Sequence, residues 1–142
     1  MRFVLNGKGK SKMGQYHVLV NLDKQEVVHP HGLGLGSKQY EHNGEFNGTL
    51  ADAMYILTMT SPARGGGDYP ITAVSARWAG DRVVVLGDYT DDKDLPNVPN
   101  ASKIYGQTEF FDDITDLVAD AFETVFRIKV EGTGWKRRVP LT

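Results

Sequence analysis

The chain lacks cysteine altogether. With none among its 142 residues, disulfides, thiolate nucleophiles and cysteine-ligated zinc sites are excluded together, as is usual for an intracellular protein. No apolar run approaches the roughly 20 residues of a membrane-spanning helix, and no export signal stands at the start. We therefore expect a soluble, cytoplasmic protein with no membrane partner.

An excess of charge of one sign is also missing. Sixteen Lys and Arg residues against eighteen Asp and Glu residues give a net charge of −2, which argues against a protein built to coat nucleic acid. One basic cluster, Lys136 to Arg138, follows Trp135. Such an aromatic could stack on a base, but a charged edge that discourages sheet aggregation is the interpretation we favour. A nucleic-acid partner is not expected.

The apolar pattern predicts an α+β fold with a mostly antiparallel sheet and two packed helices. No change of composition marks a linker, so residues 1–142 are expected to form a single domain. Residues 71–78 and 82–89 should pair as a hairpin, with Trp78 on the core side and the run 83–86 in a central strand. The predicted strands are 2–5, 16–22, 26–29, 71–78, 82–89, 127–130 and 135–139.

Two helices carry local start signals. Thr49 and Asp52 match a capping box, and apolar residues at helical spacing follow until Pro62 forbids continuation. Asp113 is expected to cap the second helix, with Asp116 in its first turn. The apolar stripe of that second helix is Ile114, Leu117, Val118, Ala121, Phe122 and Val125.

The segment from His29 to Lys38 is the one stretch whose composition folding alone does not readily explain. It joins His29-Pro30-His31 to a loop with glycine at every second position. Glycine gives up packing and backbone entropy, so the loop needs either a tight path or close approach by another molecule. The amides around Gly34 and Gly36, with Lys38, could form a nest for an anion. A loop crossing close to another strand is the alternative that we prefer.

The two histidines are also candidate metal ligands. Proline at 30 favours an extended backbone at His29, so His29 and His31 could face one divalent cation such as zinc, manganese or nickel. Glu41, His42 or a distant aspartate would have to complete the shell. The alternative is that one imidazole bonds a backbone carbonyl or caps a turn while the other is solvated.

A second glycine-rich loop, Arg64-Gly65-Gly66-Gly67-Asp68, is too flexible by composition to form regular structure. Arg64 could contact a carboxylate or phosphate through two parallel hydrogen bonds, and Gly66 and Asp68 would then join the ligand-binding residues. A plain exposed connection is equally compatible. Asp68, Asp81 and Asp88 each follow glycine, as in many turns, but together they could hold a divalent ion.

Several motifs together resemble a family of small bacterial and phage-associated proteins for which we know no established activity. The resemblance covers roughly residues 13–89 and, more loosely, the second helix and Gly134-Trp135-Lys136. It implies a natural single domain that begins near Met13, with residues 1–12 as an N-terminal extension, and it implies no mechanism. The motifs are Met13-Gly14-Gln15-Tyr16, residues 20–24, His29-Pro30-His31, Arg64 to Asp68, residues 77–82 and Gly87-Asp88-Tyr89.

The sequence contains no catalytic motif, and a non-enzymatic binding module is the function that we expect. Its loops 29–38 and 64–68 would form one surface for a small anionic ligand or a protein partner, in a setting of phage-host defence or counter-defence. One alternative is a small metal-dependent hydrolase in which His29, His31 and the aspartates activate water. Another is a structural or assembly protein that forms homo-oligomers through its basic and glycine-rich edges.

Overall fold

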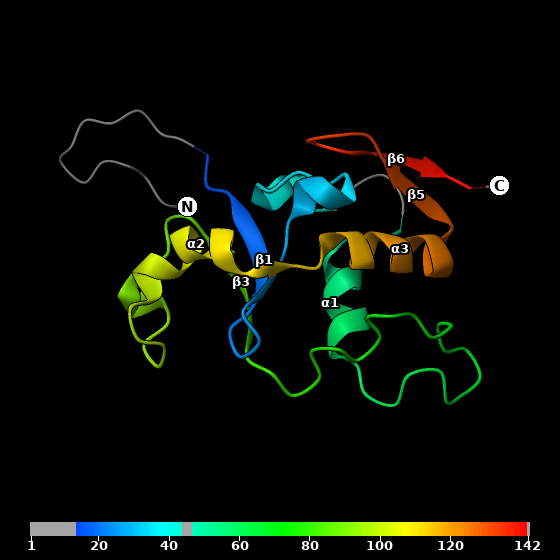
Figure 1. Ribbon diagram of the computed structural model, residues 1–142, viewed down its shortest axis with the longest axis horizontal. Coiled ribbons are helices and arrows are strands. Elements are labelled where there is room, and N and C mark those ends of the chain that lie inside the picture. Colours follow the sequence, from blue (N-terminus) through cyan, green and yellow to red (C-terminus); the bar gives the residue numbers. More distant parts are fainter. Residues whose placement is uncertain (1–13, 44–46, 142) are drawn as a thin grey trace.

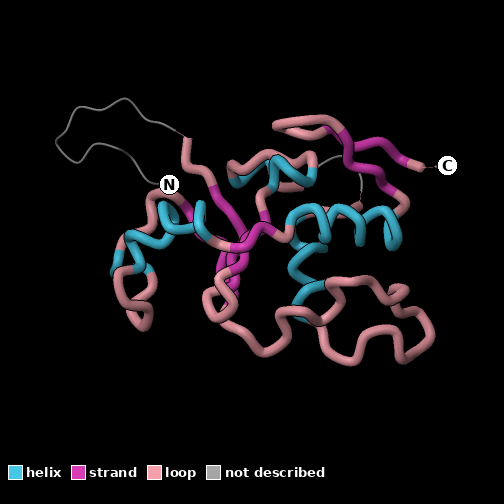
Figure 2. The backbone as a smooth tube through the Cα atoms, viewed as in Figure 1, coloured by secondary structure: helices cyan, strands magenta, loops and turns pink. Residues whose placement is uncertain are grey.

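A four-stranded sheet lies at the centre of the protein (Figures 1 and 2). The computed structural model describes residues 14–43 and 47–141, so the predicted strand 2–5 lies outside the described residues. The strand order is β3-β1-β2-β4; β1 pairs antiparallel with β2 and β3, whereas β2 and β4 run parallel. The strands are β1 (His17–Asn21), β2 (Glu26–Val28), β3 (Val83–Gly87) and β4 (Asp112–Asp113).

Both predicted helices are confirmed, as α1 (Leu50–Thr58) and α3 (Thr115–Phe126). The capping box of α1 is complete: the Asp52 amide donates to Thr49 Oγ1 at 3.2 Å, and the Thr49 amide donates to Asp52 Oδ2 at 2.9 Å. The cap residue of α3 is Ile114 rather than Asp113, although Asp113 Oδ1 accepts from the Thr115 amide at 2.9 Å. A short helix, α2 (Ile104–Gln107), was not predicted.

Both faces of the sheet are covered. On one face, Leu19 and Val28 pack against α1 and α3 in a core that includes Trp78. On the other face, β1 and β2 pack against Ala101 and Ile104 of the segment that carries α2. Figure 1 shows α2 on one side of β1 and β3 and the two longer helices on the other. Because neighbouring residues of a strand point to opposite faces, this double cover explains why Val18, Leu19 and Val20 are all buried.

The two strands predicted near the C-terminus form, and they pair with each other in an antiparallel hairpin separate from the central sheet. Its members are β5 (Ile128–Glu131) and β6 (Arg137–Pro140), with Lys129 opposite Val139. Arg127, in the left-handed region at φ 58°, ends α3 and starts the turn of the chain into β5. The hairpin lies above α3 in the view of Figure 1. The connection between β5 and β6 contains Trp135.

One predicted strand, 71–78, does not form, and the predicted pairing and central place of another, 82–89, are wrong. Residues 71–78 form successive turns, and their amides return to the end of α1: Ala76 N donates to the Ile56 carbonyl at 2.9 Å and Trp78 N to the Leu57 carbonyl at 2.7 Å. The strand β3 therefore pairs with β1, and it lies at the sheet edge rather than in the centre. Within the run 83–86 only Leu86 is buried and Val85 is 41 % exposed, so the apolar run indicates neither full burial nor a central place in the sheet. Trp78 is fully buried, as predicted.

The fold class is α+β, as predicted, but the central sheet is only partly antiparallel because β2 and β4 are parallel. Within the described part of the chain, no helix combines the length and apolar character needed to cross a membrane.

Candidate functional site

A cleft of about 630 Å³ opens beside the end of β2, and we refer to it as the histidine cleft. Four segments that are distant in sequence meet there: the start of β1, the stretch after β2, the region from α2 to β4, and the connection between β5 and β6. Its lining residues are Tyr16, Val18, His29, Pro30, His31, Gly32, Ser37, Tyr105, Asp113, Gly134 and Trp135.

His29 enters this cleft because β2 ends one residue before it and Pro30 starts a 3₁₀ helix, Pro30–Leu33. The His29 backbone is extended, and its amide donates to Thr115 Oγ1 at 2.9 Å. Its Nε2 lies 4.0 Å from Asp113 Oδ2. The other oxygen of Asp113 accepts from both the amide and the hydroxyl of Thr115. The first turn of α3 therefore positions a carboxylate facing His29.

His31 has different partners. Its Nε2 lies 3.3 Å from Ser37 Oγ, and its ring stacks on Trp135 with centroids 4.3 Å apart and an angle of 10° between the planes. The Lys136 amide donates to the His31 carbonyl at 3.0 Å, which fastens the β5–β6 hairpin to this segment. The Trp135 residue nevertheless remains 57 % exposed. An aromatic surface is thus held at the edge of the cleft.

Two tyrosines complete the wall. Burial raises the pKa of Tyr105, and the nearby Asp88 and Tyr16 act in the same direction, so the Tyr105 hydroxyl stays protonated as a hydrogen-bond donor. Tyr16 donates its amide to Asp88 Oδ1 at 3.0 Å. Lys38 does not line the cleft itself, but its Nζ lies 5.8 Å from the centroid of the Tyr16 ring, so a positive charge stands beside this wall residue, a position that we call the rim.

The glycine loop has a structural explanation. The Gly34 amide donates to the His31 carbonyl at 3.2 Å, and the Gly36 amide donates to the Glu41 carbonyl at 2.9 Å, so neither amide is free for an anion. A Cβ at Gly36 would lie 2.1 Å from the Glu41 Cβ, and one at Gly34 would lie 2.3 Å from Arg138 Cγ. The alternating glycines allow these close approaches.

The second predicted loop lies elsewhere. Asp68 Oδ2 accepts from the amides of Arg64 and Gly65 at 2.9 and 2.8 Å, which closes the loop on itself. The loop follows the end of α1 and lies far from the segment after β2 in Figure 1. Arg64, Gly66 and Asp68 line neither the histidine cleft nor the pocket described next. The structure therefore does not unite the two predicted loops in one surface.

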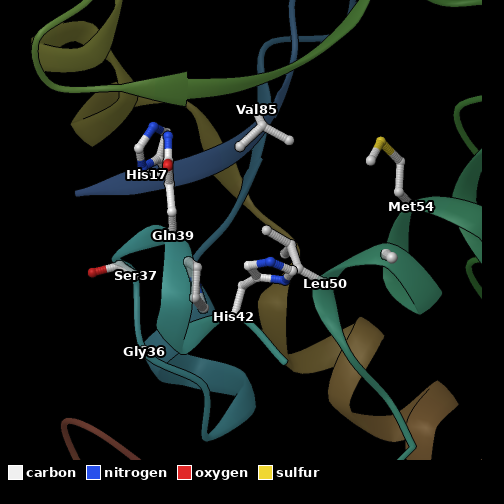
Figure 3. A pocket seen from close by; sticks show the side chains of 10 residues that line it. His17, Gly36, Ser37, Gln39, His42, Leu50, Met54 and Val85 are labelled. Carbon is white, nitrogen blue, oxygen red and sulfur yellow. The ribbon is translucent and has the colours of Figure 1, made fainter. Parts of the chain in front are cut away.

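A second cavity, of about 480 Å³, lies between the loop of residues 36–42, β3 and α1 (Figure 3). We call it the α1 pocket. It shares Pro30 and Ser37 with the histidine cleft. His17 and His42 line it, and His17 Nδ1 is buried without a hydrogen-bond partner in the described structure. A buried polar atom in this state costs about 1–3 kcal/mol.

Among the described residues, no group of three or more histidines, aspartates or glutamates could hold a metal ion. Asp81 accepts from Asn21 Nδ2 at 2.8 Å and pairs with Lys24, whose hydrogen bond is the main reason that the pKa of Asp81 is lowered. Asp68 and Asp88 have the backbone partners given above. The ligand set that the predicted hydrolase needs is not assembled within this part of the chain.

Sequence reasoning found His29 and His31 but missed much of the site around them. It treated Asp113 only as a helix cap, and it assigned no role to Tyr16, Tyr105 or the α1 pocket. The sequence holds no pattern that identifies these residues, because their side chains meet only through the pairing of β1, β2 and β4 and through the docking of the β5–β6 hairpin.

Comparisons of the chain with protein-family models, with curated proteins and with solved structures gave no match. The resemblance to small bacterial and phage-associated proteins therefore stays a prediction, and the function has to be argued from the cavities themselves.

Proposed function

We propose that the protein is a non-enzymatic binding module and that the histidine cleft recognises a small anionic ligand. The observation that carries the proposal is the convergence of hydrogen-bond donors on one concave surface. The imidazoles of His29 and His31, the hydroxyls of Tyr16 and Tyr105 and the indole of Trp135 all line the cleft. The phosphate or carboxylate oxygens of a ligand can accept hydrogen bonds from such groups.

Charge at the cleft is consistent with this ligand class. Lys38 contributes a positive charge at the rim, above Tyr16. The one acidic residue among the described lining residues, Asp113, has one oxygen bonded to Thr115 and the other directed at His29. Neither oxygen of Asp113 is therefore without a neighbouring polar group.

The exposed aromatic surface adds a second element of recognition. Trp135 is more than half exposed although His31 stacks against it. A flat ring on the ligand would pack against that surface, and contacts of this kind add about 0.5–1.5 kcal/mol. A nucleoside monophosphate combines a flat ring with an oxyanion, so adenosine monophosphate is a suitable probe.

The chain carries its own fluorescence control, because it has two tryptophans and Trp78 is fully buried. Titration with adenosine monophosphate should change the Trp135 emission in a saturable way, and the change should vanish in Trp135→Phe. Ribose 5-phosphate, which lacks the ring, should bind about tenfold more weakly. The absence of a saturable change, or the same change in Trp135→Phe, would contradict the proposed site.

A matched pair of lysine substitutions tests the contribution of charge. Lys38→Ala should weaken binding several-fold, because it removes the positive charge at the rim. Lys38 lies against Tyr16, which lines the cleft, whereas Lys129→Ala removes an exposed charge from β5, an element that contributes none of the described lining residues. Equal affinities of the two variants would show that net charge, and not the cleft, attracts the anion.

A further inference from the structure

The α1 pocket has a polar end and an apolar end, which Figure 3 shows from close by. His17, Ser37 and Gln39 lie at one side of this view, whereas Leu50 and Met54 lie toward the other. Val85, from the edge strand β3, lies above the gap between them. His42 lies near Leu50 at the lower side of the pocket. Apart from His42, the labelled polar residues therefore lie on one side of the cavity, and Leu50 and Met54 lie on the other.

The polar end is suited to an oxyanion. The imidazole of His17 and the amide of Gln39 can donate hydrogen bonds there, and the imidazole of His42 lies farther along the cavity, beside Leu50. None of the described lining residues is acidic.

The apolar end is suited to an aliphatic chain. Leu50 belongs to the buried core, and Met54 packs against that core while still lining the pocket. Val85 is 41 % exposed although it lies on a strand whose neighbour Leu86 is buried. A ligand that covers Val85 and Met54 would remove this apolar surface from water. The cavity volume of about 480 Å³ lies within the range of small-molecule sites.

We propose that the α1 pocket is a second binding site, separate from the histidine cleft, and that it binds a small amphipathic carboxylate. The carboxylate lies at the polar end, near His17 and Gln39, and the aliphatic chain extends along Leu50 and Met54 toward Val85. This site does not depend on the ligand of the histidine cleft.

Methionine methyl groups report on this site directly. Protein labelled with ¹³C at the methionine methyl groups is titrated with octanoate, below the concentration at which octanoate forms micelles. The Met54 signal should shift and saturate with a Kd below about 1 mM. Met59 lies at the other end of α1 and lines a different cavity, so its signal should stay in place. Octanol, which keeps the chain but lacks the charge, should bind at least about fivefold more weakly.

A matched pair of substitutions, each of an alanine by phenylalanine, locates the site. Ala51 lines the pocket from an exposed position of α1, so Ala51→Phe should occupy the space with little effect on the fold and should abolish the Met54 shift. Ala73→Phe places the same side chain at an exposed position that does not line the pocket, and it should bind octanoate as the parent protein does.

Three results would overturn the proposal. The first is no saturable shift of Met54, or equal shifts of Met54 and Met59. The second is unchanged octanoate binding by Ala51→Phe. The third is equal affinity for octanol and octanoate, which would exclude recognition of the carboxylate.

Discussion

The indole Nε1 of Trp78 donates a hydrogen bond of 2.7 Å to Oε1 of Glu26 inside the protein. The same carboxylate accepts from Arg77 Nε at 3.0 Å and from Arg77 Nη2 at 2.5 Å. Glu26 lies on β2 and is only 4 % exposed. This contact joins the irregular segment after α1 to the sheet, and it explains how a charged residue is accommodated in a buried strand.

Replacement of Glu26 by glutamine should destabilise the protein. The variant weakens the contact to Arg77 and leaves the Trp78 indole without a charged acceptor, so we expect a loss of about 2 kcal/mol in the free energy of unfolding. Urea unfolding measures this quantity. Glu123→Gln, at an exposed position of α3, is the control and should change the free energy by less than about 0.5 kcal/mol. Equal stability of the two variants would contradict the stabilising role of Glu26.

Stability should also depend on pH through Glu26. Hydrogen bonds from Arg77, and next from Trp78, hold the pKa of Glu26 below its ordinary value of 4.5, although burial opposes them. A carboxyl with a lowered folded pKa stabilises the native state above the unfolded pKa, and this contribution is lost as pH falls through the folded pKa. The free energy of unfolding should therefore decrease as pH falls below about 4.5. In Glu26→Gln this decrease should be shallower, and parallel curves would contradict the assignment.

The two glycine-rich loops should differ in their tolerance of alanine. A Cβ at Gly36 would overlap the Glu41 side chain, and Gly36 is buried, so Gly36→Ala should cost about 1–3 kcal/mol. Gly66 has no described heavy atom within 4 Å of a built Cβ, and its φ is not positive. Gly66→Ala should therefore lie within about 0.5 kcal/mol of the parent protein. Thermal unfolding distinguishes the two, and a Gly36→Ala variant as stable as Gly66→Ala would contradict the close packing.

Local signals in the sequence predict local structure well. The capping box at Thr49 and the apolar stripe of α3 need only neighbouring residues, and both helices form where they are predicted. The path of residues 71–81 could not be predicted in this way. The alternating apolar residues that suggest a strand are buried without one, because Val74 and Trp78 pack in the core next to the end of α1.

The candidate sites depend even more on distant contacts. His29 and His31 stand out in the sequence, but Tyr105 and Trp135 reach the same cleft from segments more than 70 residues away. The α1 pocket has no sequence signal, because its histidines are 25 residues apart and its apolar wall comes from α1 and β3. Side chains that are distant in sequence come to line one cavity through strand pairing and helix packing, which residue spacing does not specify.

The four histidines provide the most direct test of the central claim, since two line each cavity. In ¹³C-edited NMR of the imidazole rings, titration with adenosine monophosphate should shift the signals of His29 and His31 and leave those of His17 and His42 in place. That result would locate an anionic ligand in the histidine cleft. Shifts confined to His17 and His42, equal shifts of all four rings, or no saturable shift at all would contradict the account.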